Sequence, residues 1–525
     1  MSPLSAEVGD AALLFASSLQ DPARPKHCAR VLCGCLHLLD GMDRDDPYTL
    51  NEQYSIPENE DYQAIRRLYP ECLDASVAFL ALPRSDKNNE ELDAFLRTCS
   101  CSPALDENTA ELLQWLHTFE AARQFTLRDF AEALIRHLSG VLYNAVLTQT
   151  VGGTVAMGGL TKHRRKHLDS PLWPTDASRL LPRGVEGSME GYAASFRLCR
   201  DDRLQDTLAL VTKLIAICGR SLIPRLLQFH PEWPLRITDL AIRLCEERDS
   251  TLGQTIDFDV QLNWMCTLTQ IVDFCLSIAD PGQINPTDIA LFARMTVTYE
   301  DTGEVRNCGL LFVCDIILKH LPLFREGTVL FPEAAVDQLI KNFGLFGGVF
   351  YRHKLRGDTT VYHPAILATN GKAEAVQSDP LIAAFEGFGW ASMVRHCCAP
   401  ECRETFATAG RAFARCSGCG ILRYCSRPCL TRAWKHPTLP HKAVCTKLRV
   451  LRERTNLPRD RDLDPDRDRQ AFFDACGADE GLTALAQDCG KHLLALIIAR
   501  RNNSEVLIPD AFLPGADGYG KCSSY

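Results

Sequence analysis

Four cysteines in a short stretch constrain this chain more than any other feature of its sequence. The stretch CSGCGILRYCSRPC runs from Cys416 to Cys429 and spaces its thiols as C-x2-C-x5-C-x3-C. It belongs to a cysteine-rich segment, Cys397 to Cys445, that holds eight of the 24 cysteines of the 525-residue chain. Where thiols are kept reduced, such clustering indicates metal binding or catalysis rather than disulfide bonds.

The composition, the first residues and the short apolar runs of the chain together suggest that it lies where thiols are kept reduced. Hydrophobic residues make up 46% and charged residues 23%, as in soluble globular proteins, and the net charge is a mild −9. The first residues, MSPLSAEVGDAALLFASSL, lack the basic start of a secretory signal. The compact apolar run from Leu493 to Ala499 is far shorter than the roughly twenty residues that span a bilayer. We therefore expect an intracellular protein, in the nucleus or the cytoplasm, without a membrane partner.

The cysteine-rich segment has the ligand spacing of zinc sites. Zinc takes four thiolate or imidazole ligands in a tetrahedron, and two ligands separated by two to four residues reach one ion from a single turn. Eight ligands make two closed sites with no position left for a catalytic water, so we predict two structural Zn²⁺ ions. Because the segment has few large aliphatic residues, we expect metal rather than a hydrophobic core to fold it. The candidate pairs are Cys397 or Cys398 with Cys402, Cys416 with Cys419, Cys425 with Cys429, and His441 with Cys445. His436 is a second candidate for the histidine ligand.

These residues resemble a MYND-type zinc finger, as found in fungal MYND proteins with a long helical N-terminal region. The order of the pairs, the block RYCSRPC, the Trp434 that follows and the closing HKAVC carry the resemblance, which covers only the cysteine-rich segment. It favours Cys397 over Cys398, and it favours His441, which keeps the H-x3-C step, over His436. In the family the pairs interleave, which implies one site of Cys397, Cys402, Cys425 and Cys429 and another of Cys416, Cys419, His441 and Cys445.

The resemblance also implies a partner. MYND fingers bind short proline-rich peptides of other proteins, often in transcriptional regulation. Here the corresponding surface consists of Tyr424, Ser426, Leu430 and Trp434. Leu430 departs from the family, which usually has a glutamine at this position. We therefore expect a zinc-binding interaction protein, an adaptor or a transcription-associated scaffold, whose partners are proteins.

Two alternatives accompany this hypothesis. The first is an enzyme with its site in the helical part of the chain; a SET-type methyltransferase is disfavoured because its motifs are missing from the sequence, and no catalytic residue is predicted. The second is nucleic-acid binding, because eight Arg or Lys and two Glu give the cysteine-rich segment a formal charge of +6. Two zinc ions with seven thiolates would reduce this to about +3. Since no nucleic-acid-binding motif accompanies the charge, we do not expect such a partner.

The sixteen cysteines outside the segment look structural. Most lie in apolar helical stretches, where a free cysteine behaves as a small buried hydrophobe. Cys33 with Cys35, and Cys99 with Cys101, form C-x-C pairs that have no histidine or second cysteine pair nearby in the sequence. We interpret these four residues as structural too.

The rest of the chain has the periodicity of helices. Apolar residues recur every three or four positions in successive stretches, and alternating strand patterns are almost absent. We predict a mainly α protein, an irregular helical superhelix of armadillo or HEAT type with a small two-zinc finger near the C-terminus. Because no clean repeat is found, an irregular helical domain is the alternative. From Phe346 to Gln377 the helical pattern breaks. The expected domains are an N-terminal helical region (1–160), a central helical region (188–345), the finger (396–445), and a charged spacer with a helical tail (446–525).

Overall fold

The structure is a computed structural model that describes most of the chain. The described residues are 6–41, 60–99, 101, 107–150, 172–219, 221–279, 292–293, 295–298, 305–352, 359–369, 378–394, 396–402, 404, 409, 411–457 and 467–502. The predicted boundary between the first two helical regions, 161–187, falls partly outside them.

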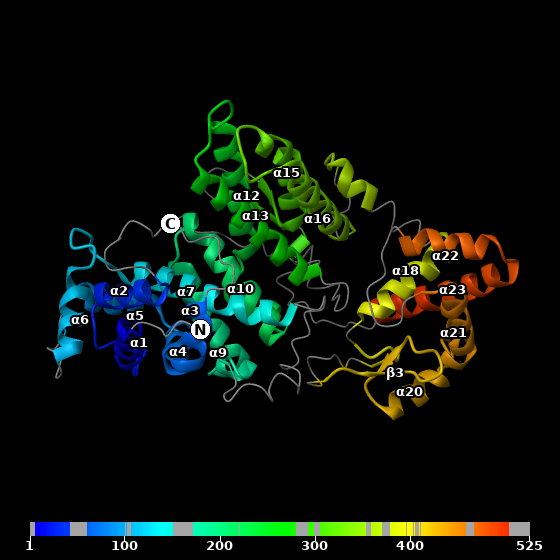
Figure 1. The fold of residues 1–525 in the computed structure, drawn as a ribbon, viewed down its shortest axis with the longest axis horizontal. Helices are drawn as coiled ribbons and strands as arrows, with labels where there is room; N and C mark the ends of the chain where they lie inside the picture. Colours follow the sequence, from blue (N-terminus) through cyan, green and yellow to red (C-terminus); the bar gives the residue numbers. More distant parts are fainter. Residues whose placement is uncertain are drawn as a thin grey trace. The chain divides into compact units, whose positions relative to one another are not determined.

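The chain divides into two compact units. One comprises Met1–Ser277 with Pro322–Val336, and the other comprises Ile278–Leu321 with Asp337–Tyr525. Helices dominate both units (Figure 1), which confirms the prediction of a mainly α protein with a small cysteine-rich region near the C-terminus. The armadillo or HEAT superhelix stays a prediction.

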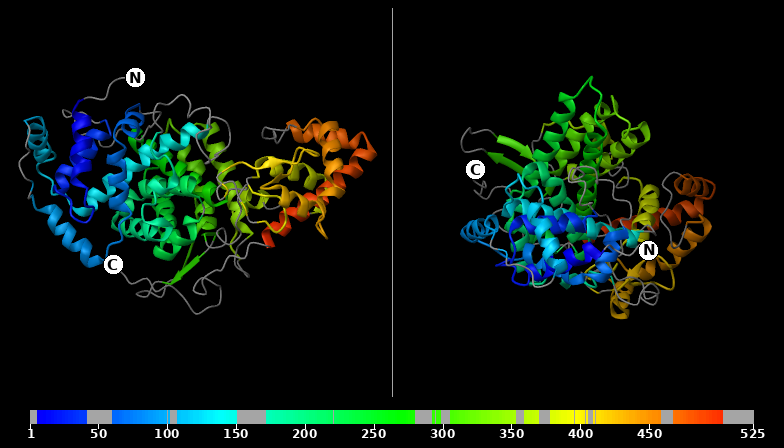
Figure 2. Two further views of the ribbon diagram at one scale, coloured as in Figure 1. Left: turned by 90° about the horizontal axis from the view of Figure 1, so that it is seen from below. Right: turned by 60° about the vertical axis from the view of Figure 1, so that its left-hand side comes forward.

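The long helix α7 (Leu127–Thr150) is the centre of the first unit. Its residues Phe130, Leu134 and Leu138 recur every four positions and are fully buried, as expected for one face of a core helix. This helix packs against α2 (Ala29–Leu39) and α10 (Leu204–Cys218). The other α-helices that the structure describes in this unit, drawn from blue to green in Figure 2, are α1 (Ala6–Ser18), α3 (Glu60–Leu68), α4 (Pro70–Leu80), α5 (Asp86–Arg97), α6 (Glu107–Thr118), α9 (Gly184–Leu198), α11 (Leu222–Phe229), α12 (Trp233–Ser250) and α13 (Phe258–Ala279, within the unit as far as Ser277).

Buried polar side chains join the helices of this unit. Asp40, at the end of α2, accepts hydrogen bonds from Tyr62 Oη on α3 (3.0 Å) and from His137 Nδ1 on α7 (2.6 Å). Burial acts to raise the pKa of Asp40, but the charge of His137 and its hydrogen bond lower that pKa below the usual value. Such pairing avoids the cost of burying a lone carboxylate.

One helix of the described residues, α13, is long and apolar enough to cross a membrane by length and composition alone. A helix in the core of a soluble protein can have the same length and apolar composition. In this structure Trp264, Leu268, Ile271 and Phe274 of α13 are fully buried in the protein. The helix therefore serves as a core helix of the first unit.

The second unit contains an antiparallel hairpin, in which β1 (Met295–Thr298) pairs with β2 (Val305–Cys308). The helices α15 (Leu310–His320) and α16 (Glu333–Tyr351, within this unit from Asp337) follow. Since α16 ends at Tyr351, the predicted break of the helical pattern at Phe346 is wrong. A Cβ at Gly347 would lie 2.6 Å from the Ile366 side chain, so this glycine lets the helix pack closely rather than ending it.

In the C-terminal part of this unit, α18 (Pro380–Met393), α21 (Cys445–Arg454), α22 (Arg467–Gly477) and α23 (Glu480–Asn502) lie close together (Figure 1). The helix α18 packs along α23, and α21 and α22 also contact α23. Their buried side chains form one continuous hydrophobic core with those of the cysteine-rich segment. The composition of the segment had suggested that metal rather than a hydrophobic core folds it. In the structure the segment also has a hydrophobic core, which it shares with these helices.

A glycine permits the close approach of α18 and α23. A Cβ at Gly490 would lie 2.0 Å from the carbonyl oxygen of Pro380 and 2.8 Å from the backbone nitrogen of Ala384. Because both are backbone atoms, no side-chain rotation relieves the clash.

We expect Gly490→Ala to lower the free energy of unfolding of the C-terminal helices by about 1–3 kcal/mol, the usual cost of overpacking. Gly477→Ala is the control, because nothing lies within 4 Å of a Cβ at that position. Urea titrations followed by circular dichroism measure both variants. Equal stability of the two would show that α18 and α23 do not pack as closely as described.

Candidate metal centre

A two-stranded hairpin forms the frame of the cysteine-rich segment. The strands β3 (Ala414–Arg415) and β4 (Arg423–Tyr424) are antiparallel, and the turn between them carries Cys416 and Cys419. The backbone nitrogen of Gly420 donates to the carbonyl of Cys416 (2.7 Å), and Gly420 has a φ of 68°, which favours glycine. This tight turn places the two thiols on one side of the hairpin.

A short helix follows the hairpin and supplies two further thiols. The helix α20 (Arg427–Trp434) is preceded by Ser426, whose hydroxyl accepts a hydrogen bond from the Cys429 backbone nitrogen at 3.4 Å. Ser426 is thus an N-cap, and Pro428 in the first turn suits a helix start. The sequence CSRPC therefore sets Cys425 before the helix and Cys429 in its first turn.

Eight residues of the segment gather in two groups of four. All four ligand atoms within each group lie within 4.8 Å of one another. The groups interleave along the chain, and they are the two that the MYND resemblance implied. We name them the first C-terminal tetrad (Cys397, Cys402, Cys425 and Cys429) and the second C-terminal tetrad (Cys416, Cys419, His441 and Cys445).

The distances within the tetrads fit tetrahedral zinc. Ligand sulfurs about 2.3 Å from an ion lie about 3.8 Å apart along the edge of a tetrahedron. In the first C-terminal tetrad, Cys425 Sγ lies 3.7 Å from Cys402 Sγ and 3.4 Å from Cys429 Sγ. In the second, Cys416 Sγ lies 3.8 Å from Cys445 Sγ. These separations greatly exceed the roughly 2.05 Å of a disulfide bond, so the donor sets suit metal binding.

The imidazole of the second C-terminal tetrad points its Nε2 atom at the sulfurs. His441 Nε2 lies 3.3 Å from Cys416 Sγ and 3.8 Å from Cys419 Sγ. His436, the other candidate ligand, lies outside the tetrad, and its Nδ1 accepts a hydrogen bond from the Leu439 backbone nitrogen (3.1 Å). Three thiolates and one imidazole match a closed structural zinc site.

Burial makes free thiolates costly in these tetrads. It raises the pKa of Cys397 above its usual value and that of Cys445 to about 11. Burial also acts to raise the pKa of Cys429, but hydrogen bonds from Ser426 and Arg432 lower it to about 7. The guanidinium of Arg432 lies 3.0 Å from Cys429 Sγ. Basic residues of the segment thus offset the negative charge of its thiols, as its composition had suggested.

The helices attach directly to the second C-terminal tetrad. Arg452 Nη1, on α21, donates to the backbone carbonyl of Cys419 at 2.8 Å. Leu448 and Leu451 of the same helix are fully buried in the shared core. Cys445 is both a ligand of the tetrad and the first residue of α21. A metal ion in this tetrad would therefore fix the start of the C-terminal helices.

The four residues predicted to bind a partner differ in exposure. Trp434 is 37% exposed, whereas Tyr424 is only 4% exposed. Ser426 is exposed but engaged as the cap of α20, and Leu430 is half-buried against the core. Tyr424 is thus largely inaccessible to a partner, whereas Trp434 is partly exposed. The neighbouring Cys398 is also buried and is not part of a tetrad; its backbone nitrogen donates to the Arg423 carbonyl (2.8 Å).

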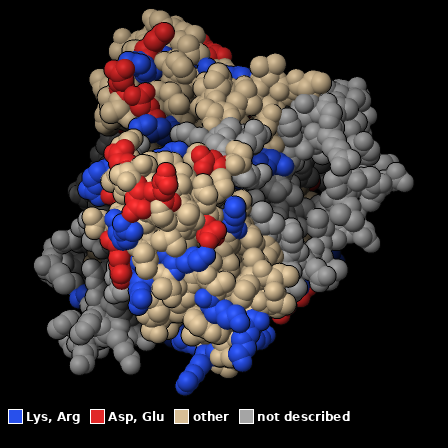
Figure 3. Space-filling view, turned by 90° about the vertical axis from the view of Figure 1, so that its right-hand side faces the viewer, with Lys and Arg blue, Asp and Glu red and all other residues tan. Residues whose placement is uncertain are grey.

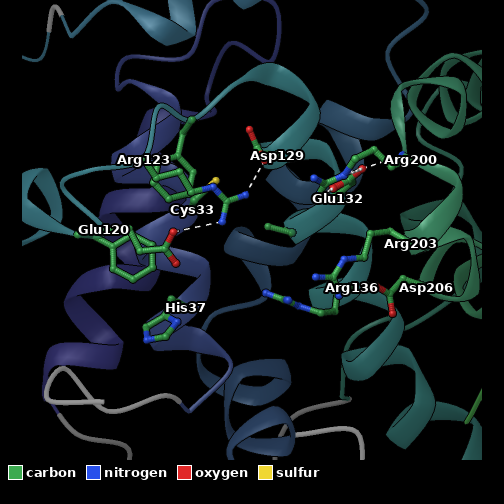
Figure 4. Close-up of a pocket in the computed structure, with 13 residues that line it drawn as sticks. Cys33, His37, Glu120, Arg123, Asp129, Glu132, Arg136, Arg200, Arg203 and Asp206 are labelled. Atoms are coloured by element: carbon green, nitrogen blue, oxygen red, sulfur yellow. Dashed lines mark hydrogen bonds and ion pairs between the residues drawn. The ribbon is translucent and has the colours of Figure 1, made fainter. Parts of the chain in front are cut away.

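A polar pocket in the first unit bears on the enzyme alternative (Figure 4). Its volume is about 90 Å³, well below the roughly 300 Å³ at which ligand sites usually begin. Its acids are largely paired: Glu120 and Asp129 lie 3.1 and 2.5 Å from the guanidinium of Arg123, and Glu132 lies 2.7 Å from that of Arg200. This arrangement is typical of a structural ion-pair network.

A third tetrad lies in the first unit, where the sequence had not indicated one. It consists of Cys28, Cys99, Cys101 and His117. Cys99 and Cys101, interpreted from the sequence as structural because no histidine or second cysteine pair is nearby, lie beside Cys28 and His117 in the structure. The sequence signal was a C-x-C pair with a histidine 18 positions after Cys99, but Cys28 lies 73 positions before Cys101 and only the fold brings it near.

No protein-family model matches the chain, and no similar protein was found among curated proteins or among solved structures.

We expect Cys425→Ala to lower the number of bound zinc ions by at least one, because three remaining ligands leave an open and weaker site. Cys398→Ala is the matched control, since this buried thiol is one residue from Cys397 but outside the tetrads. Native mass spectrometry of the full chain gives the metal count. A Cys425→Ala protein that keeps the wild-type count would exclude this residue as a ligand.

Proposed function

We propose that the chain is a MYND-type zinc-binding adaptor that holds two Zn²⁺ ions in its C-terminal tetrads and binds proline-rich peptides of partner proteins. The observation that carries the proposal is the completeness of both tetrads. Each offers four protein ligands, so a tetrahedral ion has no open position for water or substrate. Zinc in such sites stabilises a fold and leaves function to the surface around it.

One face of α20 is the proposed peptide site. Ser426, Leu430 and Trp434 are four positions apart and so lie on the same side of the helix. The ring of Trp434 stands edge-on to the imidazole of His441, with the ring centroids 5.6 Å apart. The metal ligand thereby holds an exposed aromatic side chain in place. Proline-rich segments dock on such preformed aromatic surfaces because their extended helix loses little entropy on binding.

The basic residues of the segment support a protein partner more than a nucleic acid. Figure 3 shows Lys and Arg side chains gathered at the lower end of the face it presents. Several of the basic residues hold the segment together: Arg411 donates to the Cys425 carbonyl, Arg423 to the Phe413 carbonyl, and Arg432 to the Cys429 thiol. Guanidinium groups engaged in this way contribute less to a phosphate-binding surface.

An adaptor role requires no catalysis, and we propose none. The paired acids of the polar pocket and the four-ligand metal sites support this view. The site of action that we propose is the reducing interior of the cell, the nucleus or the cytoplasm, because thiols must stay reduced to bind zinc.

The full-length chain, loaded with zinc, tests the peptide site. Titration with fluorescent proline-rich peptides should give saturable binding, and Trp434→Ala should weaken it about tenfold or more, as for an exposed aromatic anchor. Phe95→Ala is the control, because Phe95 is similarly exposed (40%) but lies on α5 of the first unit.

Zinc counts of both variants show whether the metal sites are intact. If Trp434→Ala keeps its zinc and binds the peptides as tightly as wild type, α20 is not the peptide site. If the wild-type protein binds no proline-rich peptide, this partner class is wrong, whatever the zinc count.

A further inference from the structure

The third tetrad, which we name the N-terminal tetrad, joins the ends of three helices. Cys28 immediately precedes α2, Cys99 and Cys101 follow the end of α5, and His117 lies in the last turn of α6. Their three Sγ atoms and one imidazole nitrogen all lie within 4.8 Å of one another. The grouping has the composition of the second C-terminal tetrad, three cysteines and one histidine.

The histidine is oriented as a metal ligand. His117 Nδ1 lies 2.7 Å from the carbonyl oxygen of Leu113, a distance at which Nδ1 must carry the proton and donate it. The lone pair of Nε2 then faces the thiols, and Nε2 lies 3.2 Å from Cys99 Sγ. A backbone carbonyl that fixes the tautomer of a histidine in this way is the usual support of a zinc-bound imidazole.

The thiols are also arranged for an anionic, metal-bound state. Cys28 occupies the N-cap position of α2, where the helix dipole favours a thiolate. Its backbone nitrogen donates to Cys101 Sγ at 3.4 Å, which adds a second favourable interaction with negative charge on sulfur.

Core packing does not explain this cluster. Cys33, Cys35 and Cys72 of the same unit are at most 6% exposed and serve as small apolar side chains. Cys99, in contrast, is exposed, and Cys101 is half-buried. A disulfide would use only two of the three sulfurs and would leave the oriented imidazole without a role.

We propose that the N-terminal tetrad is a third zinc site, a closed Cys₃His site that fastens the start of α2 to the ends of α5 and α6. The ligand is a soft or borderline divalent cation, of which Zn²⁺ fits four-coordinate sulfur and nitrogen donors. The site lies in the helical unit that carries none of the MYND resemblance, and it is independent of the proposed peptide site. It would clamp elements that are distant in the sequence, where a cross-link restricts the unfolded chain most.

The experiment is a metal count on the full chain, purified with zinc and a non-thiol reductant and measured by native and elemental mass spectrometry. Wild-type protein should carry three zinc ions per chain, and Cys99→Ser should carry two. Cys218→Ser is the matched control, a half-buried cysteine of the same unit that lies outside every tetrad, and it should keep three. Because Cys99 is exposed, its substitution should leave the helical circular dichroism unchanged.

A second pair of variants tests the histidine. His117→Ala should lose one zinc ion, whereas His27→Ala, which removes the partly exposed neighbour of Cys28, should keep all three. A wild-type count of two that Cys99→Ser and His117→Ala leave unchanged would overturn the proposal. A disulfide that links two of Cys28, Cys99 and Cys101 in zinc-loaded wild-type protein would overturn it as well. The number of zinc ions that Cys425→Ala loses reports on the C-terminal tetrads alone. The proposal for the N-terminal tetrad can therefore fail while the proposed C-terminal sites hold, and the reverse.

Discussion

The structure of the C-terminal part of this protein depends on seven thiols and one imidazole that are buried close together. All eight ligand residues of the two C-terminal tetrads are at most 9% exposed. Seven thiolates at this burial would repel one another and lack water, so cations must compensate them. The interleaving makes the two sites interdependent, because the hairpin turn with Cys416 and Cys419 lies between the ligand pairs of the other tetrad. An ion bound in one tetrad would therefore also support the frame of the other.

Metal bound in the C-terminal tetrads would stabilise the same structure as the hydrophobic core. Structural zinc contributes about 10–16 kcal/mol in small modules that cannot fold without it. Here the segment also shares a core with α18, α21, α22 and α23, and Arg452 connects α21 to the backbone of Cys419. The close contact at Gly490 fixes α18 against α23. Loss of zinc should thus loosen the C-terminal helices as well as the hairpin.

What the sequence could predict follows from the distance along the chain between interacting residues. The four C-terminal pairs are local, so the spacing of zinc ligands was enough to predict candidate pairs, and the MYND resemblance favoured Cys397 over Cys398 and His441 over His436. Helical periodicity was enough to predict a mainly α protein. The N-terminal tetrad escaped because Cys28 and Cys101 are 73 positions apart. The predicted end of the helical pattern at Phe346 was wrong because α16 continues to Tyr351. Gly347 lies in close contact with Ile366 there, and such a tertiary contact leaves no local pattern in the sequence.

The contact between Trp434 and His441 connects the metal with the proposed peptide surface. His441 contacts two aromatic rings, with the ring centroids of Tyr424 and Trp434 5.7 and 5.6 Å away. A zinc ion on Nε2 would fix the imidazole, and the imidazole in turn would limit the rotation of the tryptophan. An aromatic side chain that is already held in place loses less entropy when a peptide docks on it. The same exposed ring on a helix without the metal would bind more weakly, although its contact area would be unchanged. Zinc would therefore act on peptide affinity through preorganisation, without touching the peptide.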